Sequence, residues 1–252
     1  MLKRLIHLFI LLALLWPAGS WGAARVGTGV SAAGGGGDVS SLAAPAKSMT
    51  TGNTVIVFIK WENVAPNVVT SVTDTAGNTY TEITEFAHSS GVEPAGALYY
   101  STNITGNASN VVTVNFDPTP AILWTHIMVE EFSGLATSSV TDGAVQTNSG
   151  TGTSFSTSNI TTSQSGLVVL GVGGFTNLSS WSGVPGTPDF TVGVTESDSA
   201  ILYLISGSAQ TVTPAASATG SDKWVAIAQA FKDAGGGGGS TVRSLSLMQV
   251  GQ

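Results

Sequence analysis

The stretch Thr54–Trp61, TVIVFIKW, is almost continuously β-branched, aliphatic or aromatic. Residues of these types favour extended backbone, and a run without polar alternation is typical of a strand that is buried on both faces. Leu167–Val172, LVVLGV, has the same character. The two stretches therefore predict two central strands around which the other strands are arranged.

Shorter strand patterns surround these two stretches. They are Val68–Thr73, Thr79–Phe86, Ala97–Ser101, Val111–Phe116, Leu123–Phe132, Ser154–Ile160, Phe190–Thr195, Ala200–Ile205, Gln210–Thr213 and Trp224–Phe231. No polar segment beyond the N-terminal region shows the 3.6-residue apolar period and the caps of a helix. The fold is therefore predicted to be all-β, a two-sheet antiparallel β-sandwich and in particular a jelly roll.

The second half of the chain resembles the first half. TVIVFIKW, GALYYS, VTVNF and WTHIMVEEF correspond in order to GLVVLGVGG, SAILYLIS, QTVTP and WVAIAQAF. The matched residues are Tyr100 with Tyr203, Val112 with Val212, and Phe132 with Phe231. Coincidence among strands of similar composition is the alternative. A true repeat predicts two similar halves, each of which gives strands to both sheets.

The segment Ser71–Tyr80, SVTDTAGNTY, predicts a tight turn between two short strands. The carboxylate of Asp74 can cap such a turn, and Gly77 can adopt a positive φ at low cost. A hairpin corner of the scaffold explains these residues without a ligand.

Residues 1–22 have the layout of a secretory signal peptide. A basic start and the apolar run Leu5–Trp16 are followed by the small residues Ser20 and Gly22, at positions −3 and −1 before Ala23. The run is shorter than the roughly 20 residues of a spanning helix, so cleavage is favoured over a membrane anchor. We expect a secreted protein, extracellular or at the cell surface, without membrane attachment after cleavage.

Two glycine runs suggest the domain boundaries. Gly34–Gly37 and Gly235–Gly239 are predicted to be flexible linkers. Residues 23–233 are the predicted β-sandwich domain, residues 234–239 the linker and residues 240–252 a C-terminal tail. The tail, STVRSLSLMQVGQ, has strand character and is a candidate for addition to a sheet edge of its own or a second chain. A frayed tail is the alternative.

Composition excludes several functions. Charged residues are 9% of the chain, and the formal net charge is −7 without a basic run, so nucleic-acid binding lacks its electrostatic basis. The absence of cysteine excludes disulfides and thiolate metal sites. Gly, Ser, Thr and Asn take the place of the charges. Such a surface suits an extracellular β protein that contacts neutral polymers such as glycans.

Several short motifs occur in a distinctive order, namely SVTDTAGNTY, ALYYSTNI, VTVNF, VEEFSGL, TTSQSGLVVLGVG and WVAIAQAFK. This order resembles a Thr/Gly-rich module of secreted bacterial and metagenomic proteins. That module has a V-T-D-x-x-G-N-x-Y hairpin and a closing W…A-x-F-K strand. The resemblance covers about residues 50–233 and implies a β-sandwich of the kind found in surface proteins. The activity of these modules is largely unassigned, so the resemblance implies no catalytic residue.

Candidate catalytic residues are few. His126 lies in the middle of a predicted strand and is expected to be a hydrogen-bonded interior residue, while His88 is expected in a solvated loop. Glu130 and Glu131 are adjacent, so on a strand they point to opposite faces and cannot act as a pair. Glu130 could face a carboxylate of another strand, either Glu82 or Glu85, which keeps a jelly-roll glycosidase as a remote alternative. No catalytic residue is predicted.

Calcium is the metal ion that this composition favours, because oxygen ligands are abundant. The candidate ligands are Asp74 with Asn78, Asp142, and Glu196 with Asp198. None of them belongs to a dense acidic loop, so turn caps are the favoured interpretation. No metal site or cofactor is predicted.

Aromatic residues give the better indication of function. Trp181 lies in a connection rich in Gly, Ser and Pro, with Asn177 and Asp189 nearby. An exposed indole there would offer a flat surface for a pyranose ring, whereas a tryptophan folded over the end of the sandwich needs no ligand. Tyr99 is a further candidate contact. The sequence favours a non-catalytic extracellular binding or adhesion module for glycans, and the alternative is a structural subunit that self-associates through residues 240–252.

Overall fold

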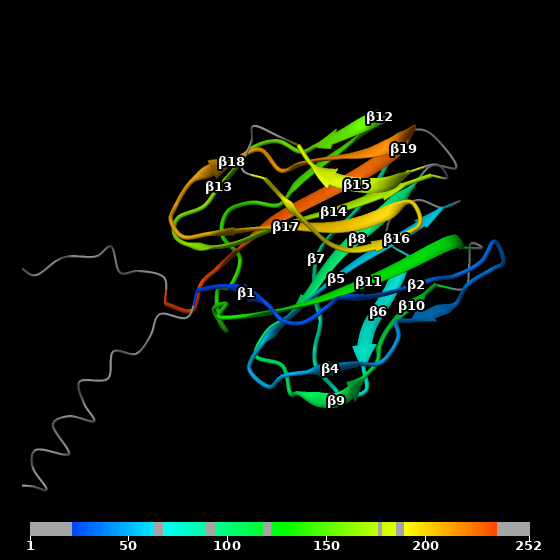
Figure 1. Ribbon diagram of the computed structural model, residues 1–252. Helices are drawn as coiled ribbons and strands as arrows, with labels where there is room; N and C mark the ends of the chain where they lie inside the picture. Colours follow the sequence, from blue (N-terminus) through cyan, green and yellow to red (C-terminus); the bar gives the residue numbers. More distant parts are fainter. Residues whose placement is uncertain are drawn as a thin grey trace, which may run out of the picture.

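The computed structural model describes residues 22–62, 68–88, 94–117, 122–175, 178–184 and 189–235. Over these ranges the chain forms antiparallel sheets that pack against one another, without any helix (Figure 1). The described part of the chain accordingly holds no helix that is long and apolar enough to cross a membrane. The predicted antiparallel β-sandwich is confirmed. Most of the predicted leader and the whole tail 240–252 lie outside the described residues.

The first large sheet is built around β5 (Thr54–Glu62), which is buried along its whole length as predicted. β5 pairs with β11 on one side and with β8 on the other. The spatial order is β1 (Ala24–Arg25), β11 (Leu123–Ser133), β5, β8 (Ala95–Ser101) and β7 (Thr81–Ala87), and β2 (Val30–Ala33) also pairs with β11.

A smaller sheet covers the outer face of this large sheet. Its order is β3 (Ser41–Ala43), β10 (Val112–Phe116) and β6 (Val69–Asp74), and a separate pair is formed by β4 (Lys47–Met49) and β9 (Asn107–Asn110). The chain passes repeatedly from one sheet to the other, because β5, β8 and β11 belong to the large sheet and β6 and β10 to the small one. This alternation is the one expected of a jelly roll.

The second half of the chain repeats the large sheet around β14 (Gly166–Gly174), which is also buried throughout. The spatial order is β12 (Gln146–Ser156), β19 (Ala215–Lys232), β14, β17 (Ser199–Ser206) and β16 (Thr191–Glu196), and β15 (Ser179–Gly183) also pairs with β19. A short pair, β13 (Ile160–Thr161) with β18 (Thr211–Val212), completes this half.

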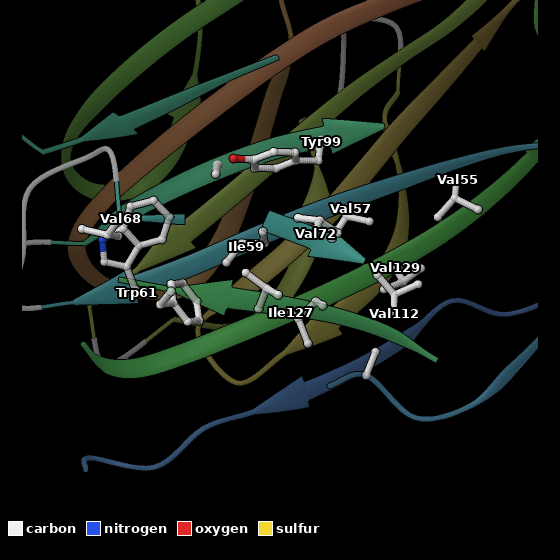
Figure 2. Packing of buried hydrophobic residues seen from close by; sticks show 14 of the residues in the cluster. Val55, Val57, Ile59, Trp61, Val68, Val72, Tyr99, Val112, Ile127 and Val129 are labelled. Atoms are coloured by element: carbon white, nitrogen blue, oxygen red, sulfur yellow. The ribbon is translucent and has the colours of Figure 1, made fainter. Parts of the chain in front are cut away.

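Alternate residues of β5 enter two different cores. Val57 and Ile59 belong to the cluster between the first large sheet and the small sheet (Figure 2). Ile56 and Phe58 belong to the cluster between the two large sheets. Complete burial of such a side chain stabilises the fold by about 1.5–3 kcal/mol. A strand between two cores cannot alternate polar and apolar residues, which explains the continuous apolar run.

The strand registers confirm the internal repeat. In the first half Ile56 lies opposite Tyr100 on one side and Glu130 on the other. In the second half Val169 lies opposite Tyr203 and Gln229. Counting two residues further along β11 and β19 gives Phe132 and Phe231, another of the pairs that the sequence comparison matched.

The repeated aromatic residues join the two large sheets reciprocally. The rings of Tyr100 and Phe231 are 5.7 Å apart at 69°, and those of Phe132 and Tyr203 are 5.4 Å apart at 70°. Both are edge-to-face contacts, an arrangement that aromatic pairs prefer. Each half therefore contributes one tyrosine and one phenylalanine to the same interface, as in an isologous dimer.

The halves are nevertheless arranged differently from the prediction. Each half was expected to give strands to both sheets of one sandwich. Instead, each half forms its own large sheet, and the two large sheets stack as the inner layers (Figure 1). The physical reason is that both faces of β5 and β14 are apolar, so each large sheet needs a covering layer on both sides.

The hairpin prediction for Ser71–Tyr80 is wrong, although its turn chemistry is confirmed. β6 pairs with β10 and β7 with β8, so this segment crosses from the small sheet to the large one. Gly77 has φ +77° as predicted. Asp74 accepts hydrogen bonds from the backbone N–H groups of Ala76 and Asn78. Its carboxylate also accepts bonds from the side chains of Asn78, Tyr80 and Asn110.

The hydrogen bonds to Asp74 predict a specific pH dependence. Burial acts to raise the pKa of Asp74, but the hydrogen bonds from Asn110, Asn78 and Tyr80 outweigh this effect and lower the pKa below the ordinary value of an aspartate. A carboxyl group with a lowered pKa stabilises the folded state above the unfolded pKa, and this contribution is lost as the pH falls through the folded pKa. We expect Asp74→Asn to lower the free energy of unfolding by about 2–3 kcal/mol at pH 7 and by clearly less at pH 3. Chemical denaturation at the two pH values measures this, and an equal loss at both would contradict it.

Candidate functional site

A pocket of about 460 Å³ opens at one end of the interface between the two large sheets. Its walls come from the end of β2 and the residues after it, the end of β5, the start of β11, the residue after β14 and the turn between β16 and β17. The lining residues are Ala33, Gly34, Gly35, Glu62, Trp124, His126, Phe175, Ser197 and Asp198. The volume lies in the usual range of small-molecule sites.

A β-bulge at the start of β11 places Trp124 at this pocket. The register between β11 and β5 shifts between Leu123 and His126, and Trp124 has φ +48°. A left-handed backbone is strained for a bulky residue and persists only where its surroundings enforce it. Trp124 is 52% exposed. Among the described residues one other large apolar residue, Ile205, is exposed, and it is less exposed than Trp124. Bulges of this kind often direct a side chain next to a functional site.

Gly34, Gly35 and Gly36 of the glycine run lie at the site and contact the start of β11, so these three residues are not the flexible linker that was predicted. The N–H of Gly34 donates to the carbonyl of Thr125, and the N–H of Trp124 donates to the carbonyl of Gly35. A Cβ atom on Gly36 would lie 2.7 Å from the indole ring of Trp124. Gly36 therefore has no room for a side chain beside the indole, and a Cβ atom on Gly34 would lie 2.3 Å from the hydroxyl oxygen of Thr125.

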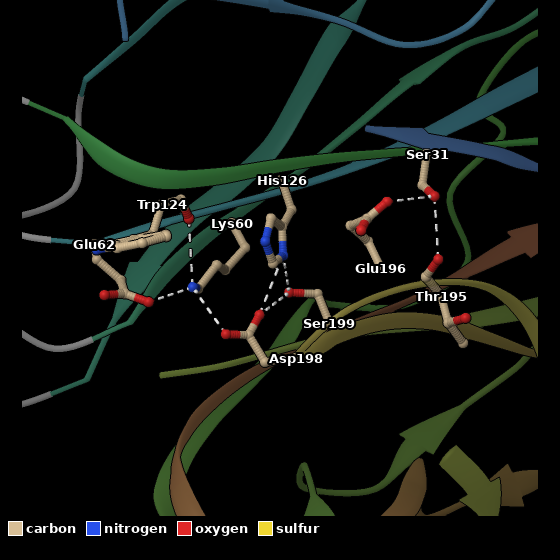
Figure 3. A network of polar contacts seen from close by, with 9 residues as sticks. All are labelled: Ser31, Lys60, Glu62, Trp124, His126, Thr195, Glu196, Asp198 and Ser199. Carbon is tan, nitrogen blue, oxygen red and sulfur yellow. Dashed lines mark hydrogen bonds and ion pairs between the residues drawn. The ribbon is translucent and has the colours of Figure 1, made fainter. Parts of the chain in front are cut away.

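Lys60 holds the carboxylates of two different sheets together. Its side chain is fully buried, and its ammonium contacts Glu62 on the same strand and Asp198 Oδ2 at 3.3 Å (Figure 3). A third contact, 3.4 Å long, joins the ammonium to the carbonyl oxygen of Trp124. Residues two apart on a strand share a face, so Lys60 and Glu62 both point toward the second large sheet. All three ammonium protons of Lys60 therefore have acceptors.

His126 connects to the same cluster through Asp198. Its Nδ1 lies 3.1 Å from Asp198 Oδ1 and 2.9 Å from the hydroxyl of Ser199. A carboxylate partner favours the proton on Nδ1, which leaves Nε2 as an acceptor. Nε2 has no hydrogen-bond partner among the described residues. The imidazole is thus fixed in orientation on one side and has an available acceptor on the other.

The pocket carries more negative than positive charge. Glu62 and Asp198 line it, while Lys60 lies behind them and is inaccessible to solvent. Burial raises the pKa of Glu62, and the ammonium of Lys60 opposes this effect without cancelling it. The site presents carboxylate acceptors whose positions are set by a buried cation.

The two aromatic residues of the predicted binding site, Trp181 and Tyr99, lie in different hydrophobic cores. Trp181 lies on β15, half-buried, with its ring 5.5 Å from that of Phe155 in the outer core of the second half. Asp189 is exposed, and Asn177 lies outside the described residues. Tyr99 is buried in the core under the small sheet, and its hydroxyl donates to Glu82. Trp181 therefore has the position of the plug that the sequence left as an alternative.

The carboxylates considered for a glycosidase have structural partners. Glu130 and Glu131 point to opposite faces as predicted. Arg25 binds both oxygens of Glu130, at 2.8 and 2.6 Å, while Glu131 accepts bonds from Thr50 and Asn53. Glu130 lies neither in the pocket nor against Glu82, which binds Tyr99, or Glu85, which accepts bonds from backbone N–H groups.

The candidate calcium ligands are also engaged. Asp74 caps its turn, Asp142 accepts bonds from the N–H and the hydroxyl of Ser163, and Glu196 accepts a bond from Ser31. Within the described ranges no three His, Asp or Glu side chains gather in a way that could hold a metal ion. Calcium binding stays a prediction.

No known protein family, curated protein or solved structure shows significant similarity to this chain. The resemblance to secreted bacterial modules therefore stays a prediction based on the motifs themselves.

Sequence reasoning missed the pocket because its residues come from five separate segments. Lys60 and Glu62 end the most apolar strand of the chain, and two charged residues in such a strand were the available signal. His126 was correctly predicted as a hydrogen-bonded interior residue. Strict alternation along the predicted strand Leu123–Phe132 would place Trp124 on the buried face of Met128, and the bulge instead leaves Trp124 exposed.

Removing the ammonium of Lys60 should destabilise the fold, because two buried carboxylates would lose their cation. We expect Lys60→Met to lower the free energy of unfolding by about 3–5 kcal/mol, and the triple variant with Glu62→Gln and Asp198→Asn to recover part of this loss. Lys232→Met is the matched control, since no ion pair involves Lys232 among the described residues, and it should cost less than about 0.5 kcal/mol. Urea unfolding measures all three, and equal stability of Lys60→Met and Lys232→Met would contradict the assignment.

Proposed function

We propose that this protein is a secreted, non-catalytic carbohydrate-binding module, and that its ligand site is the pocket at Trp124. The observation that carries the proposal is the exposed indole of Trp124, a residue with a strained backbone, at the mouth of a pocket with fixed carboxylate acceptors. The proposal keeps the function that the sequence favours and moves its site from Trp181 to Trp124.

The indole of Trp124 supplies the apolar half of a sugar site. Pyranose rings have a face of C–H groups that stacks on a flat aromatic surface. Exposure of the indole to water costs free energy. The left-handed backbone of Trp124, with φ +48°, adds to this cost. A bound ring that covers the indole would recover part of this cost. The backbone of Gly36 lies against the indole, and Gly34 and Gly35 are hydrogen-bonded to the start of β11, so the platform is in place before any ligand arrives.

The polar half comes from Glu62, Asp198 and the free Nε2 of His126. Each is an acceptor, and sugar hydroxyl groups are donors. Charge-assisted hydrogen bonds to carboxylates are about twice as strong as neutral ones. Lys60 and Ser199 already hold these groups in place, so binding loses little side-chain entropy.

The charge around the pocket supports a neutral or basic glycan over an acidic one. Glu62 and Asp198 line the pocket and the single nearby ammonium is buried behind them. An anionic sugar would therefore meet two carboxylates without an accessible cation.

Binding is favoured over hydrolysis because Lys60 contacts both carboxylates. A glycosidase needs one carboxyl group that gives up a proton and a second that attacks or activates water. Here both carboxylates are held against one buried ammonium whose three protons are fully used, so neither is a free nucleophile or base.

A glycan array of neutral, basic and acidic oligosaccharides tests the proposal directly. We expect the wild-type protein to bind neutral or basic members and Trp124→Ala to lose about tenfold to hundredfold in affinity, the usual effect of removing a central aromatic contact. Trp124→Phe should retain part of the affinity.

Ile205→Ala is the matched control. Ile205 is another exposed large apolar side chain, it lies on β17 away from the pocket, and its removal should leave affinity unchanged. Equal binding by wild type and Trp124→Ala, or no binding to any array member, would refute the site. Release of reducing ends during incubation would show hydrolysis instead.

A further inference from the structure

The start of β1 meets the end of β19 in a buried polar contact. The backbone N–H of Ala23 donates to Asp233 Oδ1 at 2.9 Å. Ala23 is 7% exposed and Asp233 is 5% exposed. The two residues are 210 positions apart in the chain, yet the start of the first described strand lies beside the end of the last (Figure 1).

The carboxylate of Asp233 has no cation beside it among the residues that the structure describes. The backbone around it is well satisfied, since its N–H donates to Ser165 and its carbonyl accepts from Gln164. The side chain itself receives only the one neutral N–H of Ala23. A buried carboxylate with a single neutral donor is expensive, because desolvation of the charge is hardly compensated.

We propose that the peptide bond between Gly22 and Ala23 is hydrolysed, and that the α-ammonium of Ala23 so created forms a buried ion pair with Asp233. Water is the co-reactant. The C–N bond breaks, the hydroxyl group joins the carbonyl carbon of Gly22, and the nitrogen of Ala23 gains hydrogen and is protonated at neutral pH. The small residues Ser20 and Gly22 stand where a leader peptidase requires them. The buried carboxylate of Asp233 is a second, independent indication that the chain is cleaved between Gly22 and Ala23.

The cleavage has to precede folding. In the folded chain Ala23 is buried, and Ala24 is paired with Ser133 of β11. A peptidase needs the chain extended and accessible on both sides of the bond. The ion pair therefore forms as the domain folds and makes the folded state dependent on correct processing.

The ion pair has a pH signature that a neutral hydrogen bond lacks. An α-ammonium has a pKa of about 7.7–8.0 in an unfolded chain, and a carboxylate partner raises it in the folded state. The stabilisation is fully present below the unfolded pKa and is lost as the pH rises through the folded one. Of the neighbouring charged groups, Arg25 on β1 is bound to Glu130. Lys232, the last residue of β19, directly precedes Asp233, and adjacent residues of an extended chain point to opposite faces.

The test begins with N-terminal sequencing of the protein exported from the full-length gene, and Ala23 is the expected first residue. Two proteins are then compared by thermal unfolding, one that begins at Ala23 and one that begins at Ser20, in which the nitrogen of Ala23 is an amide. The first should melt about 5 °C higher at pH 7, and the difference should shrink at pH 10.

Asp233→Asn is introduced into both proteins as the control, and it should abolish the difference between them at pH 7. A different N-terminal residue, equal melting temperatures at pH 7, or a difference that survives Asp233→Asn would overturn the proposal.

Discussion

The contact between the two large sheets is the constraint on which the rest of the structure depends. β5 and β14 each lie at the centre of a large sheet, and both are buried on both faces. The two sheets can approach closely only where a large side chain of one sheet faces a small residue of the other. A Cβ atom on Gly171 would lie 2.3 Å from the ring of Phe58, and one on Gly173 would lie 2.7 Å from the side chain of Lys60. The glycines of β14 therefore make room for the large residues at the equivalent register of β5, and the repeated strands have diverged into complementary surfaces.

This contact also explains why charged groups can be buried here. Lys60 extends from β5 into the interface and finds Asp198 on the other half, while Arg25 binds Glu130 and lies over the ring of Tyr203. The Lys60 contacts and the Arg25 contacts join the two halves at separate places along β11. Both sets of contacts would be broken if one large sheet were displaced along the other. Buried pairs of this kind add little net stability, but they penalise incorrect registers. At the Lys60 contacts the sheets diverge into the pocket, where the strained Trp124 is the group least explained by stability alone.

The positions of most strands and the turn residues were predictable from the sequence. The stacking of the sheets and the position of the pocket were not. The apolar run of β5, the alternating faces of β11, the turn residues Asp74 and Gly77, and the repeat registers of Tyr100 and Phe132 all follow from local patterns. β12 was largely missed because QTNSGTGTSFS has almost no apolar residue and is held by backbone pairing with β19. The stacking of whole halves was missed because periodicity shows which residues are buried but not which sheet buries them. The pocket was missed because Trp124 is exposed through a bulge, and Trp181, the tryptophan with the more loop-like sequence, packs on Phe155.

A double-mutant cycle on the reciprocal aromatic pairs tests the stacking of the two halves most directly. Tyr100 and Phe231 form one pair, and Phe132 and Tyr203 form the other, with each residue replaced by leucine singly and within its pair. If the large sheets stack as described, each pair should show a coupling free energy of about 0.5–1.5 kcal/mol in chemical denaturation. The double variant at Tyr100 and Tyr203, which belong to different pairs, is the control and should show a clearly smaller coupling free energy. Additive effects within both pairs would mean that the rings do not meet, and would contradict the account of the interface and of the pocket at its end.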